Sequence, residues 1–350
     1  MATIARIGID TSKSVFQVHG VDENEEVVLQ RKLRRREFLA FFSRLEPCLI
    51  GLEACGASHY WSRELEGLGH TVRLVPPQYV KAYVARGKND AVDAEAICEA
   101  MSRPRLARRF VSVKTAEQAA AQMMIGVRET LIRRRTQLSN AIRGHAAEFG
   151  LVAAKGLSKI EPLLTRIAAD DRLPALAKDM FAVLGQELAA LGSRIIAVEA
   201  KLMAWHRGNE LSRRLAEVPS IGPIGACLLP IKITDPHAFR SGRRCAAWIG
   251  LTAKDHSTAG KQKLGSITRA GDETLRAVMV VGATAYIQQV RRGRSKPSPW
   301  LAELLKRKPP KLAAVALANK TARIAWKLMV SGQRYDRHHA TSHNPLVTAA

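Results

Sequence analysis

The first hundred residues alternate between short apolar stretches and polar turns. Three strand-like stretches come first. After them, helix-like and strand-like segments alternate along the chain. The expected strands cover residues 4–9, 14–21, 26–33, 48–54 and 71–75, and the expected helices cover residues 36–45 and 58–68. Three strands followed by alternating helix and strand predict a mixed α/β sheet.

From Thr115 onward the strand pattern gives way to helical spacing. A seam of apolar residues recurs at intervals of four and three over about three heptads. The seam consists of Leu184, Leu188, Leu191, Ile195, Val198, Leu202 and Trp205. An earlier stretch from Met124 to Leu138 keeps this register less well, and residues 150–174 form a break between the two. Two long helices are therefore expected to pair, either as a hairpin within one chain or as a dimerising coiled coil.

The last third of the chain is expected to be mainly helical. Gly222 and Gly225 stand three residues apart between helical segments, which resembles a helix-hairpin-helix turn whose backbone amides bind phosphate. A plain turn between helices is the alternative. Residues 252–271, rich in Ser, Thr, Gly and Lys, form a predicted loop, and Asp272 is the expected N-cap of the apolar helix after it.

Positive charge is distributed unevenly along the 350 residues. The chain has 55 Lys and Arg against 31 Asp and Glu, a net charge of +24. The first hundred residues hold 13 basic and 14 acidic side chains, which leaves 42 and 17 for the remainder. An excess of this size repels itself unless a polyanion neutralises it. Nucleic acid is the expected partner of the basic remainder, and the first hundred residues keep their carboxylates for chemistry.

Composition also excludes several classes of protein. The longest nearly uncharged apolar run covers residues 277–287, which is shorter than the roughly 18 residues that a membrane span needs. The N-terminus lacks the apolar core of a signal peptide. Five cysteines without a C-x-x-C pair argue against a disulfide framework and a zinc finger, and for a reducing compartment. We expect a cytoplasmic protein that associates with the nucleoid when it acts.

Four carboxylates lie where predicted strands end and a helix begins. Asp10 follows the first strand, Glu53 ends the strand at 48–54, and Asp90 and Asp93 share one side of a predicted helix start. Taken singly, each reads as a solvated strand end or a helix cap. Together they predict a site where two Mg²⁺ ions would be held by shared oxygens, with Mn²⁺ as the alternative ion.

Ordered motifs along the chain carry a family resemblance. They are Ile7-Gly8-Ile9-Asp10, Leu52-Glu53-Ala54-Cys55-Gly56, Lys88-Asn89-Asp90-Ala91-Val92-Asp93-Ala94, Ala246-Ala247-Trp248-Ile249-Gly250-Leu251, His256-Ser257-Thr258-Ala259-Gly260-Lys261 and Val315-Ala316-Leu317-Ala318-Asn319-Lys320 with Ala322-Arg323-Ile324-Ala325-Trp326. As a set they resemble the motifs of the DEDD insertion-sequence transposases. This family, insertion-sequence family one-hundred-and-ten, is also called Piv-invertase-like. The resemblance covers nearly all of residues 3–335.

The resemblance implies a fold of several parts. It implies an RNase H-like, Holliday-junction-resolvase-like catalytic domain over residues 1–110 and a helical coiled-coil region over residues 111–210. A mainly helical C-terminal transposase domain with a serine loop follows over residues 211–332. Independently of the resemblance, the polar composition of residues 333–350 predicts a disordered tail.

The resemblance also assigns roles to residues. Asp10, Glu53, Asp90 and Asp93 would be the DEDD carboxylates that bind Mg²⁺, and Ser257 would be the nucleophile that attacks DNA. Where many relatives have Ser-Ser-Gly-Gly, this chain has Ser257-Thr258-Ala259-Gly260, so Thr258 is the alternative nucleophile.

Partners follow from the same resemblance. The family uses a noncoding bridge RNA that pairs with donor and target DNA. Recombining two duplexes takes at least two active sites, so we expect a homo-oligomer, either a dimer or a tetramer.

Three other functions compete with recombination through serine. The first is a hydrolytic junction nuclease of RNase H type, in which water attacks and the serine loop only binds the DNA backbone. The second is a nucleic-acid scaffold without catalysis. The third is an actin-like ATPase that opens on Ile7-Gly8-Ile9-Asp10, although no second phosphate loop accompanies that motif.

Overall fold

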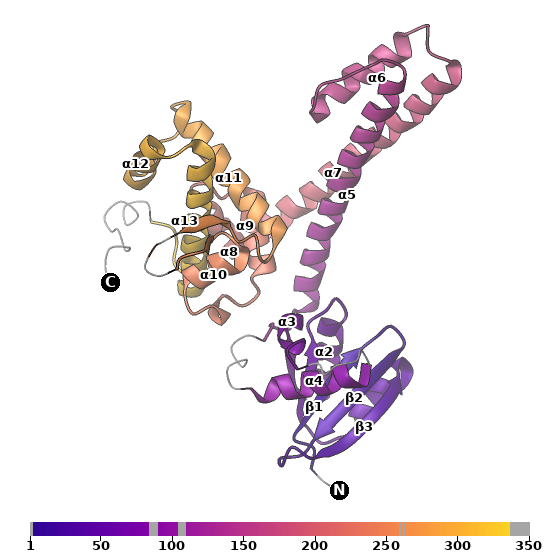
Figure 1. The fold of residues 1–350 in the computed structure, drawn as a ribbon, viewed down its shortest axis with the longest axis vertical. Helices are drawn as coiled ribbons and strands as arrows, with labels where there is room; N and C mark the ends of the chain where they lie inside the picture. Colours follow the sequence, from indigo (N-terminus) through magenta and orange to yellow (C-terminus); the bar gives the residue numbers. More distant parts are fainter. Residues whose placement is uncertain (1–2, 84–89, 104–109, 259–260, 262, 337–350) are drawn as a thin grey trace. The chain divides into compact units, whose positions relative to one another are not determined.

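A computed structural model of the chain describes residues 3–83, 90–103, 110–258, 261 and 263–336. The chain divides into two compact units, Met1–Ala119 and Ala120–Ala350. The first unit contains a five-stranded sheet with helices on both faces, and helices dominate the second (Figure 1). The predicted mixed α/β fold with a helical majority is therefore confirmed, whereas the predicted domain boundaries remain predictions.

The five strands of the first unit form one mixed sheet. They are β1 (Arg6–Thr11), β2 (Val15–Val21), β3 (Val27–Arg34), β4 (Leu49–Glu53) and β5 (Thr71–Val75). The order across the sheet is β3-β2-β1-β4-β5. The first three strands form an antiparallel meander, and β4 and β5 run parallel to β1. Each strand lies within a few residues of its predicted position.

Alternation along β1 divides the sheet into two unlike faces. Ile7 and Ile9 are fully buried under the helices that follow β3 and β4, together with the aromatic cluster of Phe16, Phe38 and Trp61. These helices are η1 (Arg35–Glu37), α1 (Phe38–Phe42) and α2 (Ser58–Gly67). This apolar face fixes the strand register, because a slip of one residue would turn both isoleucines away from the core.

The other face of the sheet carries small residues, and one helix packs directly on it. Besides the short α3 (Pro77–Val80), this part of the chain contains α4 (Asp90–Ser102), which contacts β1, β2 and β4. A Cβ on Gly8 would lie 2.2 Å from the Ala94 carbonyl oxygen, and one on Gly51 would lie 2.3 Å from the Met101 sulfur. Glycine at both positions therefore lets the helix approach the strands closely.

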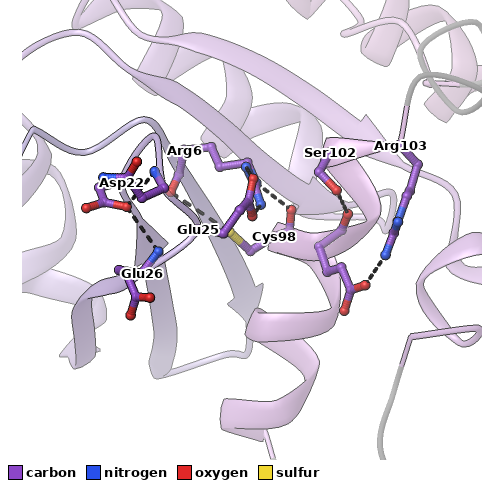
Figure 2. Close-up of polar contacts among 9 residues, drawn as sticks. Arg6, Asp22, Glu25, Glu26, Cys98, Ser102 and Arg103 are labelled. Carbon is purple, nitrogen blue, oxygen red and sulfur yellow. Dashed lines mark hydrogen bonds and ion pairs between the residues drawn. The ribbon is translucent and has the colours of Figure 1, made fainter.

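Polar contacts fix α4 along β1. The Arg6 Nε donates a 3.0 Å hydrogen bond to the Cys98 carbonyl, and the same guanidinium binds Glu25 (Figure 2). The Cys98 thiol lies 3.9 Å from the Arg6 carbonyl and donates to it. These contacts hold the C-terminal half of α4 at the N-terminal end of β1.

Adding a methyl group at Gly8 is expected to destabilise the first unit. Gly8→Ala would meet backbone atoms of Ala94 and Cys98, which cannot rotate away. Overpacking of this kind typically lowers the free energy of unfolding by about 1–3 kcal/mol. Urea unfolding followed by circular dichroism measures it. Gly67→Ala is the matched control, since a Cβ there meets nothing within 4 Å, and equal stability of the two variants would contradict the close approach of α4.

Two long helices and a short one form the first part of the second unit. They are α5 (Ala116–Glu148), α6 (Ile160–Ala169) and α7 (Ala175–Gly208), with η3 (Leu157–Lys159) before α6. The predicted break over residues 150–174, whose structure the pattern left open, contains α6, which packs Ile160, Leu163 and Ile167 against α5 and α7. That short helix lacks a side-chain cap at its N-terminus, so the sequence offered no start signal.

The predicted heptad seam packs within the chain. Leu191, Ile195 and Leu202 of the seam are buried, and Leu184 and Leu188 pack against the cluster that α5 and α6 share. Arg128 of α5 forms an ion pair with Glu199 of α7, with 2.6 Å between Nη2 and Oε1. Of the two arrangements left open by the pattern, the seam is used by the hairpin within one chain.

By length and composition alone, α7 could cross a membrane, and 17% of its most apolar window is buried. This helix is not evident as a membrane-span candidate in the sequence, because Glu187 and Arg194 interrupt its apolar run. The same two residues form an ion pair on the surface of the helix, and the seam beside them is buried in the helical unit. The pattern therefore fits a helix that packs on one side and exposes apolar residues on the other.

The remaining elements of the second unit pack around one apolar core. They are α8 (Glu210–Ala216), α9 (Pro223–Lys232), η4 (Pro236–Ala238), α10 (Gly242–Ile249), β6 (Ala253–Asp255), β7 (Leu264–Ile267), α11 (Glu273–Arg291), α12 (Pro299–Arg307) and α13 (Pro310–Ser331). Asp272 caps α11 as predicted, accepting a 2.8 Å hydrogen bond from the Leu275 amide.

Two short strands occupy the segment predicted as a loop, and that prediction is wrong. The antiparallel β6 and β7 are three and four residues long and almost fully exposed. They lack the apolar alternation by which a strand is recognised.

The turn between α8 and α9 is anchored by a 2.9 Å hydrogen bond between the hydroxyls of Ser220 and Thr321. The end of the predicted tail, residues 337–350, lies outside the described residues.

Candidate active site

Asp10 and Glu53 lie side by side at the carboxyl ends of neighbouring parallel strands. Ile9 of β1 is in register with Leu52 of β4, and the two carboxylates follow these residues directly. Each carboxylate lies two residues after a glycine that faces α4, and side chains two apart share a face of a sheet. Both carboxylates therefore belong to the face that α4 covers.

The first turn of α4 comes to the same place. The helix runs antiparallel to β1, since Cys98 contacts Arg6 and Ala94 approaches Gly8. Four residues of a helix advance about 6 Å, and two residues of a strand advance about 6.6 Å. Moving two residues along β1 from Gly8 to Asp10 therefore corresponds to moving four residues along α4 from Ala94 to its first residue, Asp90. The predicted helix start is thus confirmed, and it lies level with Asp10.

Asp93 is close enough to Glu53 to act on its charge. Burial raises the pKa of the Glu53 carboxyl, the negative charge of Asp93 raises it further, and Lys81 opposes both. The two residues come from elements forty positions apart in the chain, so the fold has brought together two of the four predicted carboxylates. Asp90 is the first residue of α4, and its side chain lies outside the described part of the structure.

The donors present suit a hard divalent cation. Carboxylate oxygens are the ligands that Mg²⁺ prefers, and a cation would relieve the repulsion between Glu53 and Asp93. Within the described residues, however, no group of three His, Cys, Asp or Glu side chains is arranged to hold a metal ion. Asp10 and Glu53 on the sheet and Asp93 on α4 would complete the set only together with further ligands, such as water or a DNA phosphate.

Neutralising Glu53 is expected to stabilise the metal-free protein near neutral pH. The pKa of this carboxyl is raised in the folded state, so its ionisation destabilises the fold as the pH rises through that value. Glu53→Gln should therefore have the higher Tm at pH 7 and the same Tm as the native chain below pH 4. Solvent screening limits the gain to about 1 kcal/mol or less. Scanning calorimetry in EDTA measures it, and a lower Tm at pH 7 would contradict the repulsion.

Ser257 lies at the exposed end of the hairpin formed by β6 and β7. Its backbone N–H donates a 2.9 Å hydrogen bond to the Asp255 carboxylate, and its hydroxyl lies close enough to act on the same carboxylate. Both interactions lower the pKa of Asp255, which therefore stays ionised. The Ser257 Oγ in turn accepts a 3.0 Å hydrogen bond from the Lys263 amide. The oxygen is oriented by an anion on one side and an N–H donor on the other.

Thr258 differs from its neighbour in its contacts. Its backbone pairs with Lys261, and among the described residues its hydroxyl has no hydrogen-bond partner.

Charged residues surround the serine on the hairpin. The exposed lysines are Lys254, Lys261 and Lys263, whose positive charge suits phosphate. Asp255 was not among the residues predicted from the sequence to belong to the site. Its spacing of two residues before Ser257 is the signal of an Asx turn and could have revealed the bond.

Two family models match the chain over the regions that hold these groups. A DEDD transposase domain matches residues 7–149, which include all four predicted carboxylates. The model of the transposase IS116/IS110/IS902 family matches residues 212–297, which include Ser257. The first match fits an RNase H-like N-terminal domain, in agreement with the sheet described above, and DEDD transposases typically use a divalent metal.

Known relatives extend the match over almost the whole chain. The transposase y4pF/y4sB of Sinorhizobium fredii is 63% identical over 95% of this chain and 86% of its own length. The transposase for insertion sequence element IS1111A of Coxiella burnetii is 35% identical over 96% of this chain and 92% of its own. The transposase for element IS1328 of Yersinia enterocolitica is 33% identical over 96% of this chain and 100% of its own. The chain therefore belongs to the IS110/IS116/IS902 family of DEDD transposases, enzymes that cut and rejoin DNA.

Proposed function

We propose that this transposase exchanges DNA strands through a covalent phosphoserine intermediate on Ser257. The observation that carries the proposal is the arrangement of the Ser257 hydroxyl, which lies between the Asp255 carboxylate and the Lys263 amide. A free serine hydroxyl is a weak nucleophile and needs a group that orients it and takes its proton. The Thr258 hydroxyl has no such contacts in the described hairpin, so we assign the role to Ser257.

The proposed step conserves the phosphodiester energy. The Ser257 Oγ forms a bond to phosphorus, and the bond from phosphorus to a deoxyribose oxygen breaks. The serine proton passes to a solvent water molecule, and the released deoxyribose oxygen takes up a proton from solvent. The hydroxyl of another strand then attacks the phosphoserine and regenerates the serine, so no ATP is needed. Because its pKa is lowered, Asp255 is a weak base, and its role is to position the hydroxyl.

We assign metal binding to Asp10, Glu53, Asp90 and Asp93. When bound there, Mg²⁺ would lower the pKa of an oxygen nucleophile and stabilise the leaving oxygen of the phosphodiester. The position of Asp10 and Glu53 at one strand edge and the effect of Asp93 on Glu53 support the assignment. The carboxylates and the serine are proposed to take part in the same strand-exchange reaction.

Donor and target DNA are the substrates, and a noncoding bridge RNA is the proposed guide. Exposed cations support nucleic-acid binding by the second unit. One group lies at the C-terminal end of α11 and directly after it, and consists of Arg291, Arg292, Arg294 and Lys296. Binding through this many cations predicts a strong salt dependence. Base pairing with the guide would leave most sequence recognition to the RNA.

We also propose that the protein acts as a homo-oligomer. Leu176, Met180 and Val183 of α7 are more than half exposed, and their spacing places them on one face. Phe149, the residue after α5, is also exposed and lines an apolar pocket together with them. A surface of this kind on a protein that must bring two DNA sites together favours a second copy of the chain as its partner.

A hydrolytic junction nuclease is the second candidate. It is favoured by the fact that Ser257 is satisfied by its own hairpin, as a purely structural serine would be. In that case water attacks at the carboxylates and the hairpin only binds the DNA backbone. The two candidates differ in their product, since hydrolysis leaves no protein attached to the DNA.

The test uses the purified full-length protein with Mg²⁺, the RNA transcribed beside its gene and DNA carrying the ends of the element. Recombination through serine produces joined strands together with a covalent protein–DNA species that resists denaturant. Nicked DNA without any attached protein would favour the hydrolytic nuclease. The same reaction in EDTA should give neither product.

A further inference from the structure

A polar pocket lies beside the carboxylates on the same face of the sheet. Its volume is about 230 Å³, and its lining includes Gln17, His19, Gln30 and Lys32 of β2 and β3, with Ala94 of α4 at one side. No step of the proposed reaction has used these residues. Because α4 lies over β1 and β2, the pocket separates the helix from the edge strand β3.

The strand register connects this pocket to Asp10. Asp10 of β1 is paired with Gln17 of β2, and Gln17 is paired with Lys32 of β3. Residues paired in this way share a face of the sheet and follow one another at about 4.8 Å. A row of polar side chains therefore runs from the proposed metal site to the edge of the sheet over roughly 10 Å.

A largely buried histidine lines the pocket. His19 is 5% exposed, and no hydrogen bond to its ring is found among the described residues. Burial lowers the pKa of this imidazole, the charge of Arg6 lowers it further, and Glu95 opposes both. The ring is therefore neutral near pH 7 and has one N–H that it can donate to a ligand in the pocket.

Positive charge gathers along the same edge. Five of the six residues 31–36 are basic, in a unit whose first hundred residues have no positive excess. Lys32 and Arg34 alternate with the buried Leu33 and so lie on the α4 face, where neither has an ion-pair partner in the described structure. The guanidiniums of Arg31 and Arg35 stack on Phe41 and Trp61 of the opposite face, and Arg31 also lines the pocket.

We propose that His19, Lys32 and Arg34 bind backbone phosphates of the DNA strand that is cut at the carboxylates. The inference rests on the proposed function, since it extends that site. Amide, imidazole and ammonium groups are donors that suit phosphate oxygens. Each strand of DNA carries a phosphate about every 3.4 Å along the helix axis, so a row of 10 Å reaches the first few phosphates beside the cut. The groups position the strand and do not read its bases.

The experiment compares two charge-matched pairs of substitutions in the full-length protein. One variant carries Lys32→Gln with Arg34→Gln, and the control carries Arg35→Gln with Arg36→Gln. Both remove two charges from residues 32–36, but only the first includes a residue that lines the pocket. Fluorescence anisotropy with a short labelled DNA duplex, without Mg²⁺, gives the affinity over a range of KCl concentrations. Thermal unfolding verifies that both variants are folded.

We expect the Lys32 and Arg34 variant to bind DNA about ten-fold or more weakly and to lose about 0.9 of the salt slope for each phosphate contact. The control should change affinity by less than about two-fold. His19→Phe should weaken DNA binding while leaving the protein folded. Equal losses in both pairs would overturn the inference.

The result separates this inference from the proposed function. If native protein forms no covalent adduct but the Lys32 and Arg34 pair still determines affinity, the phosphate row stands and the serine chemistry fails. If the adduct forms while both pairs behave alike, the serine chemistry stands and the row is wrong.

Discussion

Replacing Ser257 with alanine is expected to abolish the covalent protein–DNA adduct and strand joining. The hydroxyl is the atom that would bond to phosphorus, and removing a nucleophile typically reduces turnover by about 10³-fold or more. The loss should be confined to chemistry, because Ser257 is exposed and contributes little to packing. Gel electrophoresis under denaturing conditions measures the adduct, and anisotropy should show unchanged DNA affinity.

Two neighbouring substitutions sharpen this prediction. Thr258→Ala removes a hydroxyl from the same exposed hairpin and should leave adduct formation within a few-fold of the native level. Asp255→Asn should lower the rate while leaving DNA affinity unchanged, since the carboxylate that orients the Ser257 hydroxyl is lost. If Ser257→Ala still forms the adduct and Thr258→Ala does not, the nucleophile has been assigned to the wrong residue.

Replacing the carboxylates is expected to stop Mg²⁺-dependent chemistry. Asp10→Asn and Glu53→Gln each keep the size of the side chain and remove one proposed ligand. Since outer-shell partners of metal ligands already cost about 10- to 100-fold when mutated, losing a ligand should cost at least about 100-fold in the rate of strand exchange. Quenched-flow measurement over a range of Mg²⁺ concentrations checks this, with an accompanying rise in the Mg²⁺ needed for half-maximal rate.

The matched control for the carboxylates is on the same helix as Asp93. Glu99→Gln removes one negative charge from α4 about two turns further along, where the side chain forms an ion pair with Arg103. It should leave the Mg²⁺ dependence unchanged. Equal activity of Asp10→Asn and the native protein would refute metal binding at the strand edge and would favour the noncatalytic scaffold.

Much of the first unit could be predicted from its sequence. Runs such as residues 48–54 and 71–75 are apolar, short and bounded by turn residues, so their strands were evident. The convergence of Asp10 and Glu53 followed because parallel neighbours end at the same edge. The role of Gly8 and Gly51 did not follow, because a glycine gives no indication of which helix approaches it.

Elements that depend on tertiary contacts were harder to predict. The strands β6 and β7 are short, exposed and polar, and only their pairing defines them. Helix α6 is held by burial against α5 and α7 rather than by a capping signal. The bond between Ser257 and Asp255 is local and could have been predicted, whereas the pocket at His19 requires the register of three strands. Sequence patterns report periodicity, and sites built across elements require the fold.

The most direct measurement of the central claim is mass spectrometry of the protein–DNA adduct. After nuclease and trypsin digestion, we expect one nucleotide attached to the peptide that spans residues 255–261, with fragmentation placing it on Ser257. The modified peptide should be absent when the reaction contains EDTA or the Asp10→Asn protein. A nucleotide on any other residue, or a modified Ser257 that forms equally well without the carboxylates, would contradict the account.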